Sequence, residues 1–310
     1  GRPNIIVFTG AFHGRTTLTM TMTAKKAYAV GMGPFPDGVY RAEFPNLYRA
    51  PGHMTEEEAI QYYIEKLEQV FIEATPYDAC AAIVFEPVQG EGGFIPAPIE
   101  WVKAVRKICD DHGIMMICDE VQCGWARSGK MFASQYFKDA GCAPDIMSTA
   151  KSIAGGMPLS AVTARAEIMD AVPGGTIGGT YGANAVSAAS ALAVIDVMKR
   201  DDYPAKAMHI ADVVGKRFNA WKDKYECVGD VRGTGAMIGI EFVKSKATKE
   251  PDATLVGAIV QEAMNNGLML ESAGTYGNVV RFLCPLCVTD AQLEAGCEIF
   301  EKAIETCIAK

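Results

Sequence analysis

The sequence lacks several features that mark other classes of protein. No apolar run approaches the ~20 residues of a membrane-spanning helix, and the longest helical candidate, 185–197, carries Asp196. Basic residues are in deficit, since 29 Lys and Arg against 37 Asp and Glu give a net charge of −8. A nucleic-acid-binding scaffold normally has a basic face. We therefore expect a globular protein whose partners include neither membrane nor nucleic acid, with about two domains for this length.

Metal and nucleotide motifs are also absent. Ten cysteines are scattered through apolar segments, and only Cys284-Pro-Leu-Cys287 has a metal or redox spacing, without the second pair that a zinc site needs. No Walker sequence is present, and the glycines around Gly31 and Gly33 do not complete a dinucleotide fingerprint. We therefore expect that the protein binds no metal. We also expect its thiols to be reduced and mostly buried, and the protein to be cytoplasmic. The opening Gly-Arg-Pro-Asn leads directly into an apolar run, so we expect no signal peptide.

Short apolar segments alternate with amphipathic ones along the first two thirds of the chain. Strands are predicted at 5–8, 81–85, 114–118 and 145–150, and helices at 55–74, 99–113 and 185–199. Strands of this kind between helices indicate a mostly parallel sheet with helices on both faces. From about residue 203 the pattern changes to amphipathic helices with strands at 236–243 and 279–283. The predicted fold is therefore α/β, with a large domain (1–202) and a smaller C-terminal α+β domain (203–310).

Three consecutive predicted strands end in ionisable residues, Glu86, Asp119 and Lys151. Ligands of open α/β sheets bind beyond the carboxyl ends of the strands. Burial lowers the pKa of a lysine, as a Schiff-base amine requires, and a neighbouring Asp suits the ring nitrogen of pyridoxal phosphate. A plain Asp–Lys salt bridge at the end of the sheet explains the same spacing.

Two further segments have candidate ligand-binding residues. Phe12 and Arg15 follow the first strand, where a ring could stack on a flat cofactor and a guanidinium could hold a carboxylate, although a core Phe beside a surface Arg is the plainer interpretation. The glycine-rich run 178–184 precedes a helix, so its amides could bind phosphate.

Taken together, these segments resemble the class III aminotransferases, pyridoxal-phosphate enzymes of fold type I. The motifs that occur in the family's order are Phe12-His-Gly-Arg15, Glu86-Pro-Val-Gln-Gly-Glu91, Asp119-Glu-Val-Gln122, Ala150-Lys151-Ser, Gly179-Thr180-Tyr181 and Val280-Arg281-Phe282. Within the family, Gly31-Met-Gly33-Pro34 and Gly155-Gly156-Met-Pro158-Leu159 resemble the 4-aminobutyrate aminotransferase subgroup.

The resemblance implies that pyridoxal 5′-phosphate is the cofactor. Lys151 would form the Schiff base and move the proton, and Asp119 would keep the pyridine nitrogen protonated; these two would be the catalytic residues. Glu86 would support the cofactor and Arg15. The remaining implied cofactor contacts are His13 behind Asp119, Phe12 and Val121 on the two ring faces, Gln122 at the phenolic oxygen, and Thr180 at the phosphate of the neighbouring subunit.

The resemblance also implies the reaction and the assembly. An amino group would pass from an ω-amino acid such as 4-aminobutyrate to 2-oxoglutarate. Arg15 and Arg281 would clamp the substrate carboxylates, and Glu91 would neutralise Arg281 whenever the substrate has no carboxylate for it. Active sites would be shared across a homodimer, or across a tetramer built from such dimers.

Two alternatives and one departure from the family remain open. A racemase or epimerase of the same family would use the same cofactor without needing a carboxylate switch. The family's Ser-Gly phosphate loop and the segment before the first strand are not in this sequence. We expect a truncated form of a longer protein rather than a natural remnant, and an inactive fragment is the second alternative. The sequence does not distinguish the amino donor, because enzymes for 4-aminobutyrate, ornithine-like compounds and other ω-amines would have similar sequence motifs.

Overall fold

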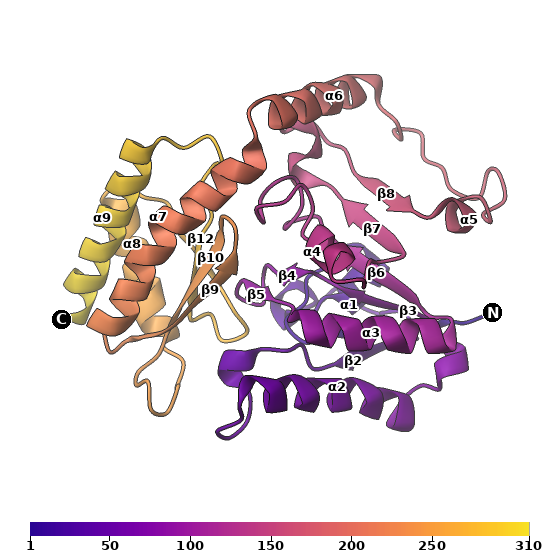
Figure 1. The fold of residues 1–310 in the computed structure, drawn as a ribbon, viewed down its shortest axis with the longest axis horizontal. Helices are drawn as coiled ribbons and strands as arrows, with labels where there is room; N and C mark the ends of the chain where they lie inside the picture. The colour runs from indigo at the N-terminus through magenta and orange to yellow at the C-terminus, as the bar shows by residue number, and fades with distance from the viewer. Residues whose placement is uncertain (310) are drawn as a thin grey trace.

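A six-stranded sheet forms the core of the N-terminal part of the molecule (Figure 1). The computed structural model describes residues 1–309. The strand order is β2 (Val39–Ala42), β1 (Asn4–Phe8), β3 (Cys80–Phe85), β6 (Met115–Asp119), β7 (Ile146–Thr149) and β8 (Ala161–Ala164). All neighbours are parallel except β8, which is antiparallel to β7. The mostly parallel sheet is confirmed, while strands β2 and β8 were missed from the sequence.

Helices α2 (Glu56–Glu73) and α3 (Ile99–His112) lie on one face of this sheet (Figure 1). Their apolar stripes meet the strands in an aromatic cluster, where the rings of Phe8 and Trp101 lie 5.1 Å apart and edge to face. Helix α2 begins with a capping box at Thr55, and α3 ends at Gly113 in the left-handed conformation. Both boundaries agree with the sequence prediction.

The other face is covered more lightly. Here the short helix α1 (Thr17–Met22) packs Met22 against Val7 and Val84. The remaining elements of the N-terminal part are β4 (Val88–Gln89), β5 (Ile95–Pro96), α4 (Ser134–Asp139), α5 (Ala166–Met169) and the 3₁₀ turns η1 (Lys26–Tyr28), η2 (Leu47–Arg49), η3 (Tyr77–Ala79) and η4 (Lys151–Ala154).

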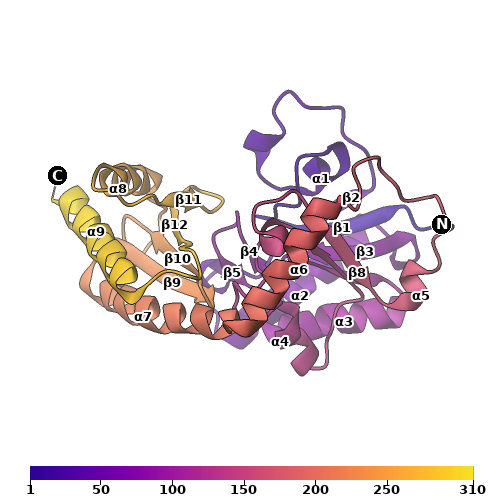
Figure 2. The ribbon, with the colours of Figure 1, turned by 90° about the horizontal axis from the view of Figure 1, so that it is seen from above.

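A second, antiparallel sheet forms at the C-terminal end of the molecule (Figure 2). Its order is β11 (Glu271–Ala273), β12 (Val279–Phe282), β10 (Met237–Phe242) and β9 (Val228–Thr234). Helices α7 (Tyr203–Lys224), α8 (Ala253–Asn265) and α9 (Asp290–Ile308) pack on it around Phe218 and Phe300. Helix α6 (Ala185–Arg200) turns into α7 at Asp201–Asp202. The domain boundary at 202/203 stays a prediction.

Within residues 1–309, no helix combines the length and apolar character needed to cross a bilayer. The same residues contain no group of His, Cys, Asp or Glu side chains arranged to hold a metal ion. Six of the cysteines are buried: Cys80, Cys109, Cys118, Cys123, Cys142 and Cys297.

Candidate active site

A small cavity lies at the carboxyl ends of β1, β3, β6 and β7, the edge at which an α/β sheet offers its ligand site. Its walls come from four separate parts of the sequence, which the parallel strand order brings together. The lining residues are Phe12, His13, Gly14, Glu86, Glu91, Asp119, Val121, Gln122 and Lys151.

Asp119, the last residue of β6, is held in place by three hydrogen bonds. Its Oδ2 lies 2.8 Å from Nδ1 of His13, and its Oδ1 accepts from the backbone N–H of Val121 (3.1 Å) and the hydroxyl of Ser148 (3.2 Å). Only 8% of the residue is exposed. A buried carboxylate with this many donors keeps a fixed orientation.

Lys151 follows β7 and opens the turn η4, with a left-handed φ of 47°. The residue as a whole is exposed, yet it also lines the cavity. Burial lowers the pKa of the amine, although the negative charges of Glu86 and Asp119 oppose this shift. Among the described residues the amine has neither a hydrogen bond nor a close ion pair, so it remains available to react.

Glu86 follows β3 and is 5% exposed. Its two oxygens accept from the backbone N–H groups of Phe12 and Gly90, each at 2.9 Å. Burial raises the pKa of this carboxyl to about 7, with the charge of Asp119 adding to the shift against the opposing effects of His13 and the two amides. Its contacts therefore fix the loops around Phe12 and Gly90 rather than reaching Arg15.

Two buried polar atoms of the cavity lining have no protein partner within residues 1–309. They are Oε1 of Gln122 and Nε2 of His13. The Gln122 side chain passes so close to Gly90 that a Cβ there would clash with Oε1. Unsatisfied buried polar atoms are rare, and at a cavity they indicate the place of a ligand.

Glu91 joins the two ends of the molecule electrostatically. Its Oε1 accepts from Nη1 of Arg281 on β12 at 2.6 Å, while its Oε2 accepts from Nζ of Lys25 at 3.0 Å and from the hydroxyl of Tyr28 at 3.1 Å. Burial alone would raise the pKa of Glu91, but the cations of Arg281 and Lys25 outweigh it and lower the pKa.

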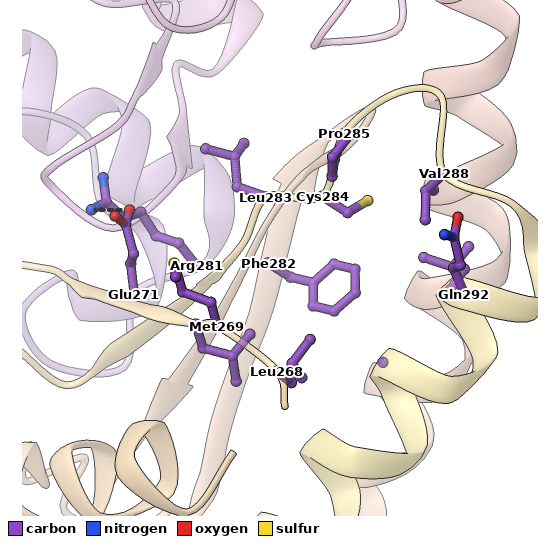
Figure 3. A pocket seen from close by; sticks show the side chains of 13 residues that line it. Leu268, Met269, Glu271, Arg281, Phe282, Leu283, Cys284, Pro285, Val288 and Gln292 are labelled. Atoms are coloured by element: carbon purple, nitrogen blue, oxygen red, sulfur yellow. Dashed lines mark ion pairs between the residues drawn. The ribbon is translucent and has the colours of Figure 1, made fainter. Parts of the chain in front are cut away.

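The two arginines predicted to bind substrate have different surroundings. Arg15 is exposed, and its guanidinium carbon lies 4.3 Å from the centre of the Tyr28 ring. Arg281 also pairs with Glu271 at 2.9 Å, the dashed contact in Figure 3. It stands at the rim of an apolar cavity of about 430 Å³, which is lined by residues including Phe282, Cys284 and Val288.

Thr180 is, like Arg15 and Arg281, a predicted site residue outside the lining of this cavity. It belongs to an exposed stretch between α5 and α6 and does not line the cavity. Neighbouring Tyr181 is 90% exposed.

Four residues at the site were missed from the sequence: Lys25, Tyr28, Ser148 and Glu271. Ser148 is the register partner of Asp119 on the adjacent strand, so aligning the ends of the two strands would have found it. Glu271 is the register partner of Arg281, and it was missed because strand β11 was not predicted. No spacing in the sequence marks Lys25 and Tyr28, whose contacts with Glu91 are made from the turn η1.

Comparison with known proteins places the chain in a family. The Aminotransferase class-III family model matches residues 1–304. The chain belongs to the class III aminotransferases. Relatives include a 5-aminovalerate aminotransferase of Pseudomonas putida, 45% identical and matching 97% of this chain and 69% of its own, and a probable 4-aminobutyrate aminotransferase of Bacillus subtilis, 41% identical over 98% and 69%.

Solved structures agree with this assignment. An amine transaminase from an uncultivated Pseudomonas species, in its pyridoxal-phosphate-bound form, superposes with a TM-score of 0.90 at 29% identity, covering 98% of this chain and 70% of that one. The fold is therefore that of the fold type I transaminases, and pyridoxal 5′-phosphate is the cofactor of the family.

The residues of the cavity fit this cofactor in part. An unpartnered amine at Lys151 and a fixed carboxylate at Asp119 match an aldehyde and a protonated ring nitrogen, and the unsatisfied amide oxygen of Gln122 can accept from a phenolic hydroxyl. The lining residues include no cation besides Lys151 and no cluster of amides that would hold the phosphate. The cavity thus has residues that can bind the ring of the cofactor, whereas its phosphate needs groups from outside this cavity.

Proposed function

We propose that this class III aminotransferase transfers the amino group of an ω-amino acid, of the length of 4-aminobutyrate or 5-aminovalerate, to 2-oxoglutarate. The observation that supports this proposal most directly is the Glu91–Arg281 ion pair beside the cavity that Lys151 lines. A guanidinium neutralised by a side-chain carboxylate suits an enzyme that must accept a donor with one carboxylate and an acceptor with two. The names of the relatives support the same donor class.

Arg15 is proposed to bind the carboxylate that both substrates share. It is exposed and planar, and its guanidinium is held over the Tyr28 ring, which leaves the edge of the fork free for a bidentate contact. Arg281 would bind the second carboxylate of the oxo acid once Glu91 has moved away, and would stay paired with Glu91 when the ω-amino donor is bound.

The cofactor would be held by the residues at the strand ends. Asp119, fixed by His13 and Ser148, would accept a hydrogen bond from the protonated ring nitrogen; Gln122 would bond the phenolic oxygen; Phe12 and Val121 would cover the two faces. Bound pyridoxal phosphate supplies an electron-withdrawing ring that acidifies the carbon bearing the amino group.

Lys151 is proposed both as the point of covalent attachment and as the base. Its Nζ would take a proton from the amine-bearing carbon and return it at the other end of the transfer. The lowered pKa increases the fraction of neutral amine at neutral pH, which is the form that can accept a proton.

A homodimer with shared active sites, alone or paired into a tetramer, is part of the proposal. The chain segment around Thr180 is exposed and includes large apolar side chains, among them Ile177 (76% exposed) and Tyr181 (90% exposed). Exposed apolar surface of this kind suits a protein interface. Thr180 would then reach the phosphate of the neighbouring subunit. We also place the protein in the cytoplasm, which suits its buried thiols.

The test is a single-turnover assay of the full-length protein loaded with pyridoxal phosphate. Addition of 4-aminobutyrate or 5-aminovalerate is expected to shift the cofactor's visible absorption to the amine form, and 2-oxoglutarate is expected to restore it. A racemase would instead release deuterium from an enantiopure amino acid without any oxo acid. An absorption spectrum that no ω-amino acid changes would contradict the proposal.

A further inference from the structure

Lys25 and Tyr28 lie outside every motif of the predicted site, yet both touch Glu91. Lys25 is the N-cap of the 3₁₀ turn η1 and Tyr28 is its last residue, and both bind the same carboxylate oxygen, Oε2, at 3.0 and 3.1 Å. Oε1 is bound separately by Arg281 at 2.6 Å. The two oxygens of Glu91 therefore have different partners on the two ends of the molecule.

The separate partners of the two Glu91 oxygens become important when a substrate carboxylate binds Arg281. Glu91 then loses its Oε1 partner, and a half-buried carboxylate without a cation is costly. The side chain of Glu91 is 14% exposed, so water alone replaces little of what is lost. Lys25 is the second cation on the carboxylate, and it approaches from the large sheet's side of the site, independently of Arg281.

Tyr28 links this arrangement to the first carboxylate clamp. Its hydroxyl donates to Glu91, its ring lies 4.3 Å from the guanidinium carbon of Arg15, and the same ring packs edge to face on Phe12 at 5.4 Å. The Nζ of Lys25 also lies 5.1 Å from the ring centre. One aromatic side chain thus connects both arginines and the predicted stacking residue.

We propose that Lys25, supported by the Tyr28 hydroxyl, is a positioning residue that holds Glu91 while a dicarboxylate occupies Arg281, and that it thereby sets the enzyme's ability to alternate between substrates with one and two carboxylates. The inference rests on the proposed function and deepens it. Lys25 is suited to the task because it stays charged: burial lowers the pKa of its amine, but the hydrogen bond and the charge of Glu91 raise it by more.

The test uses unreactive analogues and measures binding rather than turnover. Glutarate has the two carboxylates of 2-oxoglutarate, and pentanoate has the single carboxylate of 5-aminovalerate; neither carries an amino or oxo group. Calorimetric titration of the loaded full-length protein gives a dissociation constant for each. In Lys25→Met the glutarate constant is expected to rise about tenfold, the scale of one partly exposed charge-assisted hydrogen bond, with the pentanoate constant unchanged within about twofold.

Three further variants separate this role from general effects of charge and folding. Lys26→Met removes the same charge one residue away, at an exposed position, and is expected to leave both constants unchanged. Lys25→Arg is expected to restore glutarate binding. Tyr28→Phe keeps the ring over Arg15 but loses the hydroxyl, so it should weaken glutarate binding alone.

Equal weakening of both ligands in Lys25→Met, no weakening, or the same loss in Lys26→Met would each overturn the inference. If the lysine variant does not fold, the glutarate selectivity of Tyr28→Phe decides the same point. The proposed function is tested separately. It fails if no ω-amino acid changes the absorption spectrum of the unmodified protein.

Discussion

The Glu91–Arg281 pair gives the sharpest test of the proposed substrate class. We consider Glu91→Gln, which keeps the shape of the side chain and removes its charge. The two side chains are 14% and 10% exposed, so the pair is largely shielded from water. Breaking a fully buried pair costs about 3–5 kcal/mol. Because Glu271 still pairs with Arg281 at the surface, we expect a loss of only about 1–2 kcal/mol in unfolding free energy here.

Two measurements follow from this variant. The thermal midpoint should fall by about 2–8 °C, since each kcal/mol corresponds to about 2–4 °C in a chain of a few hundred residues. With the ω-amino donor bound, Arg281 in the variant keeps only its exposed partner Glu271, so the kcat/KM of the donor should fall about tenfold, equivalent to about 1.4 kcal/mol of transition-state stabilisation. The oxo acid no longer competes with Glu91 for Arg281, so its KM should fall.

Glu271→Gln is the matched control. It removes the other carboxylate from the same guanidinium, but Glu271 is 63% exposed, and an exposed pair contributes about 0–1 kcal/mol. We expect little change in either substrate. If Glu91→Gln changes the kinetic constants of donor and acceptor in the same direction and by the same factor, the switching role of Glu91 is refuted.

Three other predictions concern the strand-end residues. Lys151→Ala should abolish the visible absorption of the bound cofactor and turnover while moving the thermal midpoint by less than about 2 °C, since the residue is exposed; retained turnover would remove the assignment. Arg15→Lys should raise the KM for 2-oxoglutarate, because a point charge replaces the planar fork that stacks on Tyr28; an unchanged KM would place the clamp elsewhere. Glu86 has a folded-state pKa raised to about 7, so between its ordinary pKa near 4.5 and pH 7 the unfolded chain loses a proton that the native state keeps, and stability falls as pH rises through this window. Glu86→Gln should flatten that dependence in thermal melts at pH 5 and 7.5, and an equally steep profile in the variant would contradict the assignment.

Much of the large sheet was predictable, because buried parallel strands are read from uninterrupted apolar runs. The strands at 81–85 and 114–118 and the helix from Thr55 lie within a residue or two of their predicted bounds. Strands β2 and β8 were not found, because they lie at the edges of the sheet and their partly exposed residues show no clear apolar run. Strands β9 and β11 were missed for the same reason, each being an edge of the small sheet.

The candidate site divides in a similar way. Residues at or just beyond the carboxyl ends of strands, such as Asp119 and Lys151, could be placed together from strand order alone. Lys25 and Tyr28 could not, because they reach Glu91 from a 3₁₀ turn that no pattern in the sequence predicts.

The sequence by itself determined the parallel sheet and the set of ionisable groups at its carboxyl edge, because apolar periodicity and strand-end position are local properties of the chain. Only the tertiary structure decided which charges meet. Arg281 lies 190 residues from Glu91, and their 2.6 Å contact depends on how the C-terminal sheet packs against the large one. The partners of each charge therefore come from packing over long distances, while its presence at the site is set by the nearest few residues.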